Sequence, residues 1–200
     1  MTEPDTTGVL DSVTSPALNE GWIRAVLFDH AIDDWVDLGP DPIRRRHAGQ
    51  IYADHVGAAY AAWKWLSDRA GADVDIPPAD QAVPDALALE IGAGDWTELM
   101  AALLTVGRAQ AVLFAELAAG GDEAARRAFD RVGRDCAGHA ALAFLELRRG
   151  TFTDRDRAVA ALRRMVPATA ALLAGTGADS RWSGRLEPLL AALGWDLTKV

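Results

Sequence analysis

Apolar residues recur along most of this chain at every third or fourth position, which is the spacing of one face of an α-helix. The sequence has no run in which apolar and polar residues alternate with the β-branched enrichment typical of a strand. The pattern therefore predicts an all-α protein. The predicted helices lie near residues 19–38, 41–70, 95–119, 122–149, 153–174 and 186–193, with one more short segment at 85–91.

Capping and helix-ending residues divide the first four of these helices into two antiparallel hairpins. Gly39-Pro40 ends the first helix, and Asp41-Pro42 starts the second with a capping acid and a proline at the first helical position. Gly120-Gly121 separates the third helix from the fourth just as tightly. A long connection joins the two hairpins and ends in a capping box at Asp95 and Glu98.

This order of hairpin, crossover and hairpin is the plan of a ferritin-like antiparallel four-helix bundle with one long crossover. A haem-oxygenase-like bundle or the ligand domain of a regulator would also be helical, but the two tight hairpins favour the ferritin-like plan. Thr153 with Asp156 is predicted to cap a C-terminal helical extension, which Pro167 should kink or break. We expect one domain over residues 19–200, preceded by a flexible arm at 1–18.

Polar side chains interrupt the apolar stripes of all four bundle helices. They are Asp29 on the first helix, His55 on the second, Gln110 on the third, and Asp135 and His139 on the fourth. Burying such groups without partners costs roughly 1–3 kcal/mol each. We therefore expect both histidines to point into the bundle, with Asp135 or Asp29 within hydrogen-bond reach of one of them. An ion pair between Arg108 and Asp135 is a variant of the same arrangement.

Two motifs carry a resemblance to a known family. Ferritin-like di-iron proteins place a Glu-x-x-His motif on one helix of each hairpin, and this chain has Tyr52-x-x-His55 and Cys136-x-x-His139 at the matching places. The stretch RDCAGHAALAFLELRRG is similar to the D-E-x-x-H-A helix of the phenylacetyl-CoA epoxidase subunits, and RLEPLLAALGWDL is similar to their closing helix. The resemblance extends over about residues 19–197.

That branch contains catalytic di-iron subunits and structural subunits that have lost the metal. By the resemblance, Asp29 stands for the first-helix carboxylate, while Tyr52 and Cys136 replace glutamates that would hold iron. The resemblance thus implies a buried polar centre with a degenerate di-iron site, no catalytic residues and no cofactor. It implies a protein that acts by association, as a homodimer or as a hetero-oligomer with a related helical subunit.

Two alternatives remain at this point. One is a metal-dependent oxygenase or hydroxylase acting on an acyl-CoA-like or aromatic substrate. Its iron or manganese would be held by the altered ligand set Asp29, His55, Asp135 and His139. The other is a bundle that binds a small molecule without chemistry.

The amino-acid composition further limits the possible functions and locations of the protein. Two hundred residues, half of them apolar, are enough for one full core, and seven tryptophans indicate core and interface packing. A net charge of −9 argues against binding to nucleic acid, which requires a basic face. The single cysteine, Cys136, suits a reducing compartment. The sequence shows no signal peptide, and we expect no membrane span and a cytoplasmic location.

Overall fold

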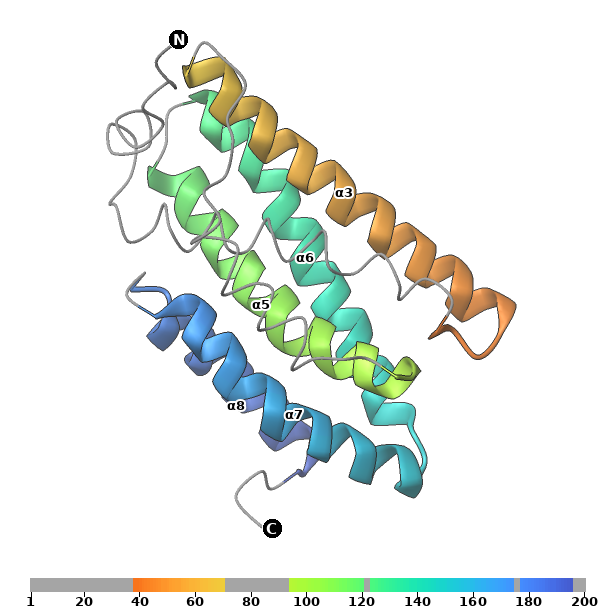
Figure 1. Cartoon of the computed structure of the whole chain (residues 1–200). Helices are drawn as coiled ribbons and strands as arrows, with labels where there is room; N and C mark the ends of the chain where they lie inside the picture. Colours follow the sequence, from red (N-terminus) through yellow and green to blue (C-terminus); the bar gives the residue numbers. More distant parts are fainter. Residues whose placement is uncertain (1–37, 71–93, 121–122, 175–176, 196–200) are drawn as a thin grey trace, which may run out of the picture.

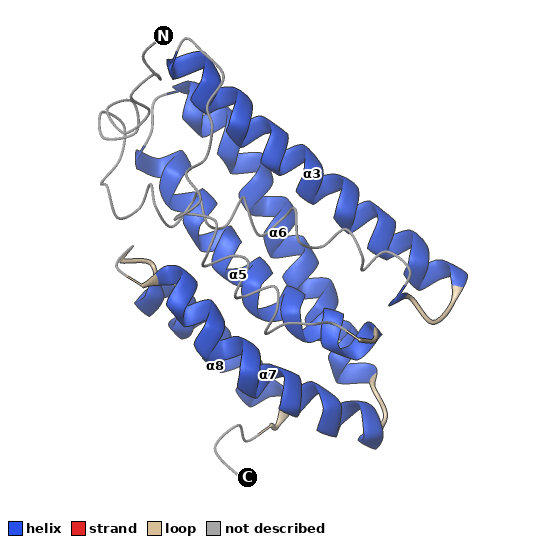
Figure 2. Ribbon diagram, viewed as in Figure 1, coloured by secondary structure: helices blue, strands red, loops and turns tan. Residues whose placement is uncertain are grey.

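The computed structural model describes residues 38–70, 94–120, 123–174 and 177–195 (Figure 1). Every regular element in these ranges is helical, which confirms the all-α prediction (Figure 2). The long helices are α3 (Pro42–Ala70), α5 (Trp96–Gly120), α6 (Glu123–Arg149), α7 (Phe152–Leu173) and α8 (Asp179–Leu193). The predicted arm at 1–18 and the predicted segment at 85–91 lie outside the described residues, and so does all but the last residue of the predicted helix at 19–38.

Helices α5 and α6 form an antiparallel pair at the centre of the molecule (Figure 1). Helix α3 packs along α6, and α7 and α8 pack along α5 on the other side. The sequence predicted the last two helices as an extension of the bundle. They instead complete the main core, because Leu162 and Met165 of α7 and Trp182 and Leu186 of α8 are buried in it.

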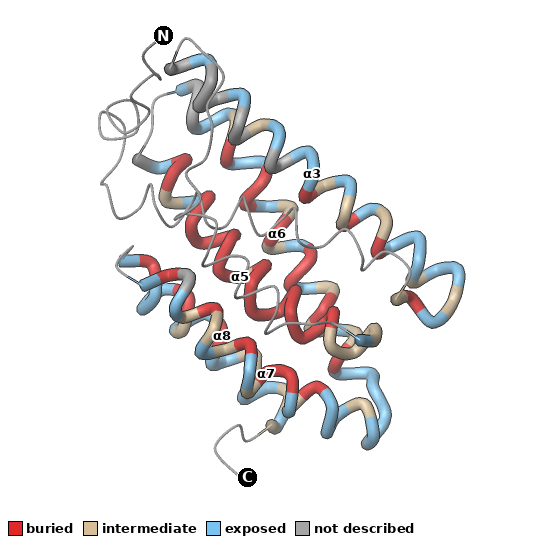
Figure 3. Tube along the Cα trace, viewed as in Figure 1, coloured by how far each residue is buried: buried red, intermediate tan, exposed pale blue. Residues whose placement is uncertain are grey.

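Helix α5 is central because its sequence is apolar on almost all sides, and such a helix is stable only when neighbours surround it. Buried residues follow it along most of its length (Figure 3). It is also long and apolar enough to cross a membrane by length and composition, which corrects the expectation that no segment qualifies. However, 83% of its most apolar window is buried inside the protein, and a buried core helix has the same length and composition.

Small residues allow α5 and α6 to approach each other closely. A Cβ atom at Gly133 would lie 3.4 Å from the Cβ of Phe114, and one at Gly107 would lie 3.5 Å from the carbonyl oxygen of Cys136. Nearer the hairpin end, the rings of Phe114 and Phe129 stack with their centroids 5.9 Å apart. The α5–α6 contact is therefore continuous, and it forms the rigid base on which α3 packs.

The predicted caps at Asp41 and Asp95 are confirmed. The carboxylate of Asp41 accepts hydrogen bonds from the backbone amides of Ile43 and Arg44, each at 2.9 Å. Asp95 accepts from the amide of Glu98 at 3.0 Å, and the Glu98 carboxylate reaches back to the amide of Gly94 at 2.9 Å. These bonds satisfy amide groups that the first turn of a helix leaves unpaired.

The predicted start of α7 was wrong by two residues. The cap is Thr151, whose hydroxyl accepts from the amide of Asp154, while the Asp154 carboxylate accepts from the Thr151 amide. Thr153 lies within the first turn instead. The shift arises because α6 ends at Arg149 and only Gly150 and Thr151 separate it from α7, so the earlier threonine occupies the cap position.

Two further boundaries differ from the sequence prediction. Helix α7 runs through Pro167 without a break. Helix α8 also begins at Asp179, seven residues before the predicted start at 186. Burial of Trp182 against the core compensates for the weak helical signal of the segment DSRWSG, because tertiary packing overrides local propensity.

Candidate functional site

Two buried histidines meet where α3 packs on α6. His55 of α3 is 2% exposed and His139 of α6 is 9% exposed. Their rings stack with centroids 5.2 Å apart and an interplanar angle of 28°. Both histidines therefore lie inside the bundle, as their places on apolar stripes predict. We call these two residues, together with Asp54, the histidine centre.

Among the described residues, the acid that hydrogen-bonds His139 is Asp54, which the sequence analysis did not predict. His139 Nε2 lies 3.1 Å from Oδ2 of Asp54, which is on α3 beside His55. Asp135 is instead 43% exposed at its side chain and pairs with Arg131 at 3.5 Å. Although Asp135 precedes His139 by one helical turn, its carboxylate lies toward solvent, so the expected bond between the two is replaced by one that crosses from α3 to α6.

Helical periodicity did not identify Asp54 as part of the centre, although its position in the sequence indicates this role. Asp54 is next to His55, at the margin of the apolar stripe of α3, where a side chain reaches across a helix interface. Gln50, one turn earlier, donates from Nε2 to Oδ1 of Asp54 at 2.9 Å. Both carboxylate oxygens of Asp54 are therefore engaged, and the acid is held in position toward His139.

The environment of His139 favours its neutral form. Burial lowers the pKa of His139 most strongly and the neighbouring His55 lowers it further, while Asp54 and Asp135 partly offset these effects. Among the described residues, no hydrogen-bond partner reaches its buried Nδ1 atom. This arrangement matches a neutral imidazole that donates from Nε2 to Asp54 and keeps its unshared electron pair on Nδ1.

The remaining predicted residues do not extend the centre into a ligand cage. Gln110 and Cys136 are buried, Tyr52 is partly buried, and Asp29 lies outside the described residues. Arg108 does not pair with Asp135, whose partner is Arg131.

Metal binding requires ligand atoms that converge on one point. The part of the chain that the structure describes contains no group of three or more His, Cys, Asp or Glu side chains able to hold a metal ion. Of the three ligands in the iron or manganese alternative that the structure describes, His55 and His139 are brought together, whereas the Asp135 carboxylate pairs with Arg131.

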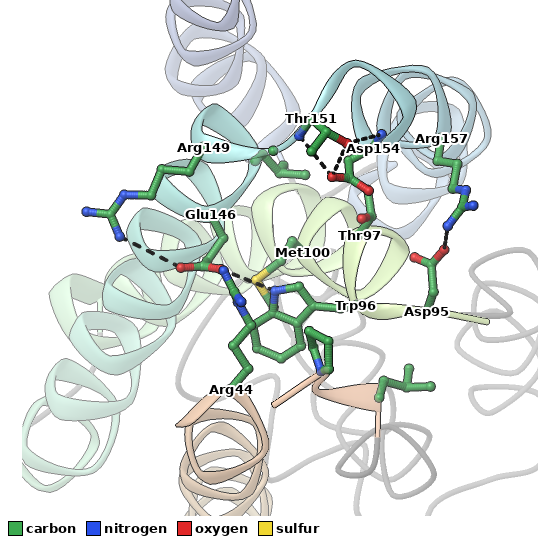
Figure 4. Close-up of a pocket in the computed structure, with 14 residues that line it drawn as sticks. Arg44, Asp95, Trp96, Thr97, Met100, Glu146, Arg149, Thr151, Asp154 and Arg157 are labelled. Atoms are coloured by element: carbon green, nitrogen blue, oxygen red, sulfur yellow. Dashed lines mark hydrogen bonds and ion pairs between the residues drawn. The ribbon is translucent and has the colours of Figure 1, made fainter. Parts of the chain in front are cut away.

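A second feature is a cavity of about 460 Å³ at one end of the bundle (Figure 4). The N-terminal ends of α3, α5 and α7 meet the C-terminal end of α6 there. Glu146 is central: its Oε2 accepts from Nε of Arg44 at 2.7 Å and from the indole nitrogen of Trp96 at 3.3 Å. Its side chain is only 13% exposed, so one carboxylate of α6 connects the first turns of α3 and α5.

Charges around this cavity are largely paired with each other. Arg157 pairs with Asp95 at 3.0 Å, and Asp154 is engaged in the α7 cap. The raised pKa of Arg44 has the same origin, because Glu146 and Asp41 both accept hydrogen bonds from its guanidinium group. The sequence analysis did not identify this junction, because its members come from four helix ends and share no periodic signal.

We expect Glu146→Leu to lower the free energy of unfolding by about 1–3 kcal/mol, because it leaves the Trp96 indole and Nε of Arg44 without their acceptor. Glu146→Gln keeps a carbonyl acceptor and should cost less. Urea denaturation measures both. Glu123→Gln is the matched control, because it removes an exposed acid paired with arginines and should change stability by less than about 0.5 kcal/mol. Equal costs for all three variants would contradict this role of Glu146.

Comparison of the chain with family models, with curated proteins and with solved structures found no match.

Proposed function

We propose that this protein acts by association with a helical subunit and performs no chemistry of its own, like the structural subunits of phenylacetyl-CoA epoxidase that its sequence resembles. The proposal includes the ferritin-like four-helix plan and a cytoplasmic location. The observation that carries it is the histidine centre. Stacked imidazoles hydrogen-bonded to Asp54 fill the interior at the α3–α6 contact, where the resemblance would place metal ligands.

Helix α3 offers the surface that such association would use. Val56 is 42% exposed and Tyr60 is 61% exposed, and they lie one turn apart on this helix. Exposed apolar side chains that adjoin each other are a feature of protein interfaces, in which tyrosine is also enriched. We propose that a second helical chain, either another copy or a related subunit, packs on this face.

The test is the state of association of the purified protein. We expect a dimer, homo or hetero, that buries at least about 1,200 Å² in total. At micromolar concentration, sedimentation equilibrium should show the mass of that dimer. The double variant Val56→Asp, Tyr60→Asp should weaken the dimer at least about tenfold, because it places two charges in the interface. The control is Leu145→Asp, which changes an exposed apolar residue of α6.

Two outcomes would contradict the proposal. One is a monomer at every concentration with no co-purifying helical subunit. The other is stoichiometric iron or manganese in the aerobically purified protein that is lost in the double variant His55→Leu, His139→Leu, which would favour the oxygenase.

A further inference from the structure

One partly buried cation of the described core, Arg108, has a buried side-chain nitrogen without a hydrogen-bond partner. Arg108 lies on α5, and its Nε atom is buried with no hydrogen-bond partner among the described residues. A buried donor that is left unpaired costs about 1–3 kcal/mol, and more when it belongs to a charged group. Native proteins rarely accept this cost unless a water, an ion or a ligand supplies the missing acceptor.

Contacts between α5 and α8 place a second arginine beside the first. The indole nitrogen of Trp182 donates to the carbonyl oxygen of Thr105 at 3.1 Å, and Arg181 forms an ion pair with Glu116. These two contacts lie on either side of Arg108 and fix α8 along α5. Arg185, an exposed residue one turn beyond Trp182, lies close enough for its charge to act on Arg108.

The electrostatics of Arg108 agree with this placement. Burial lowers the pKa of its guanidinium group, and the positive charge of Arg185 lowers it further. No acid of the described chain appears among the groups that act on it. The nearby acid Glu116 is already paired with Arg181. Two like charges therefore lie near each other in the described structure, and an anion that both contact would offset their repulsion.

We propose that Arg108 and Arg185 form a binding site for a small oxyanion, a phosphate or carboxylate group, between α5 and α8. The guanidinium group presents several N–H donors in a plane and pairs with such anions through two parallel hydrogen bonds. An oxyanion at this position accepts from Nε of Arg108 and neutralises the repulsion between the two arginines. The proposed association does not depend on this oxyanion site, so an experiment can contradict either proposal without contradicting the other.

Binding of inorganic phosphate to the full chain tests the site directly. Isothermal titration and thermal unfolding are carried out in phosphate and in chloride of equal ionic strength, and acetate gives a second arm that distinguishes carboxylate from phosphate. The wild type should bind at least one of the two oxyanions and unfold at a higher temperature in its presence. Arg108→Gln and Arg185→Gln should each weaken binding at least about tenfold, the loss of a charge-assisted hydrogen bond.

Arg148→Gln is the matched control, because it removes one positive charge from an exposed position on α6. A response that is equal in this variant and in the two site variants would indicate a general ionic effect and would overturn the proposal. Absence of any response to phosphate and acetate in the wild type would do the same.

Charge reversal provides a second, independent readout. Arg185→Glu supplies a carboxylate beside Arg108 from the protein itself, so this variant should unfold at a higher temperature than the wild type in chloride. It should also lose the response to phosphate. Arg148→Glu controls for the change of two charge units, and a gain in stability no larger than in that control would contradict the proposed site.

Discussion

Trp182→Ala is expected to lower the free energy of unfolding by about 3–5 kcal/mol, one of the two largest effects predicted for this chain. Trp182 is 3% exposed, lies in the main core, and donates its indole hydrogen to the carbonyl oxygen of Thr105. The substitution leaves a cavity between α8 and α5 and removes that hydrogen bond. Chemical denaturation followed by far-UV circular dichroism measures the loss.

The conservative change at the same position separates packing from hydrogen bonding. Trp182→Phe keeps most of the apolar volume and loses the donor, so it should cost only about 1–2 kcal/mol. If Trp182→Ala cost less than about 1 kcal/mol, α8 would not belong to the same cooperative unit as the central pair, contrary to the fold described above.

The second large effect is a dependence of stability on pH that originates at His139. Its pKa in the folded protein lies below the ordinary value of 6.5, because burial and the adjacent His55 disfavour the charged form. The unfolded chain therefore binds a proton at a higher pH than the folded chain does. Stability is fully present above the unfolded pKa and falls as the pH drops through 6.5 toward the lowered folded pKa, where the loss ends.

The slope in that window has an upper limit of about 1.4 kcal/mol per pH unit, the value for one proton. The charged and titratable groups around His139 are Asp54 and His55 on α3 and Asp135 on its own helix. Because protonation places a cation beside His55, the loss weakens the contact between α3 and α6 in particular. Hydrogen exchange of α3 amides should then accelerate at lower pH more than that of α5 amides.

His139→Gln tests the origin of this slope. The amide can still donate to Asp54 but does not titrate, so the unfolding free energy should depend less on pH between neutrality and mildly acidic values. His47→Gln removes an exposed histidine from the same helix as His55 and serves as the control. An unchanged slope in His139→Gln would exclude this histidine as the source.

Local sequence was sufficient for the helices that the structure describes and for most of their boundaries. Asp41 and Asp95 act through bonds to residues only a few positions away, so their signals are readable in the chain itself. The error at α7 shows the limit of this kind of signal. Thr151 and Thr153 are each followed three residues later by an aspartate, and the end of α6 decided which pair caps the helix.

The burial of the two histidines was also determined by the sequence, because a residue on an apolar stripe points toward whatever covers that stripe. The hydrogen-bond partner of His139 was not determined by the sequence. Asp135 lies at a favourable spacing on the same helix, yet Asp54, distant by 85 positions, forms the hydrogen bond. Only the rotation of α3 against α6 decides which carboxylate crosses the interface, and helical periodicity carries no information about that rotation.

Contacts between helices account for everything else that the sequence analysis did not find. The junction at Glu146 brings together side chains from different helices, and so does the proximity of Arg185 to Arg108. Periodicity and capping describe one helix at a time, so the sequence determined which helices form and which faces they bury. The tertiary structure alone decided which polar groups meet, because that depends on the register and the angle at which the helices pack.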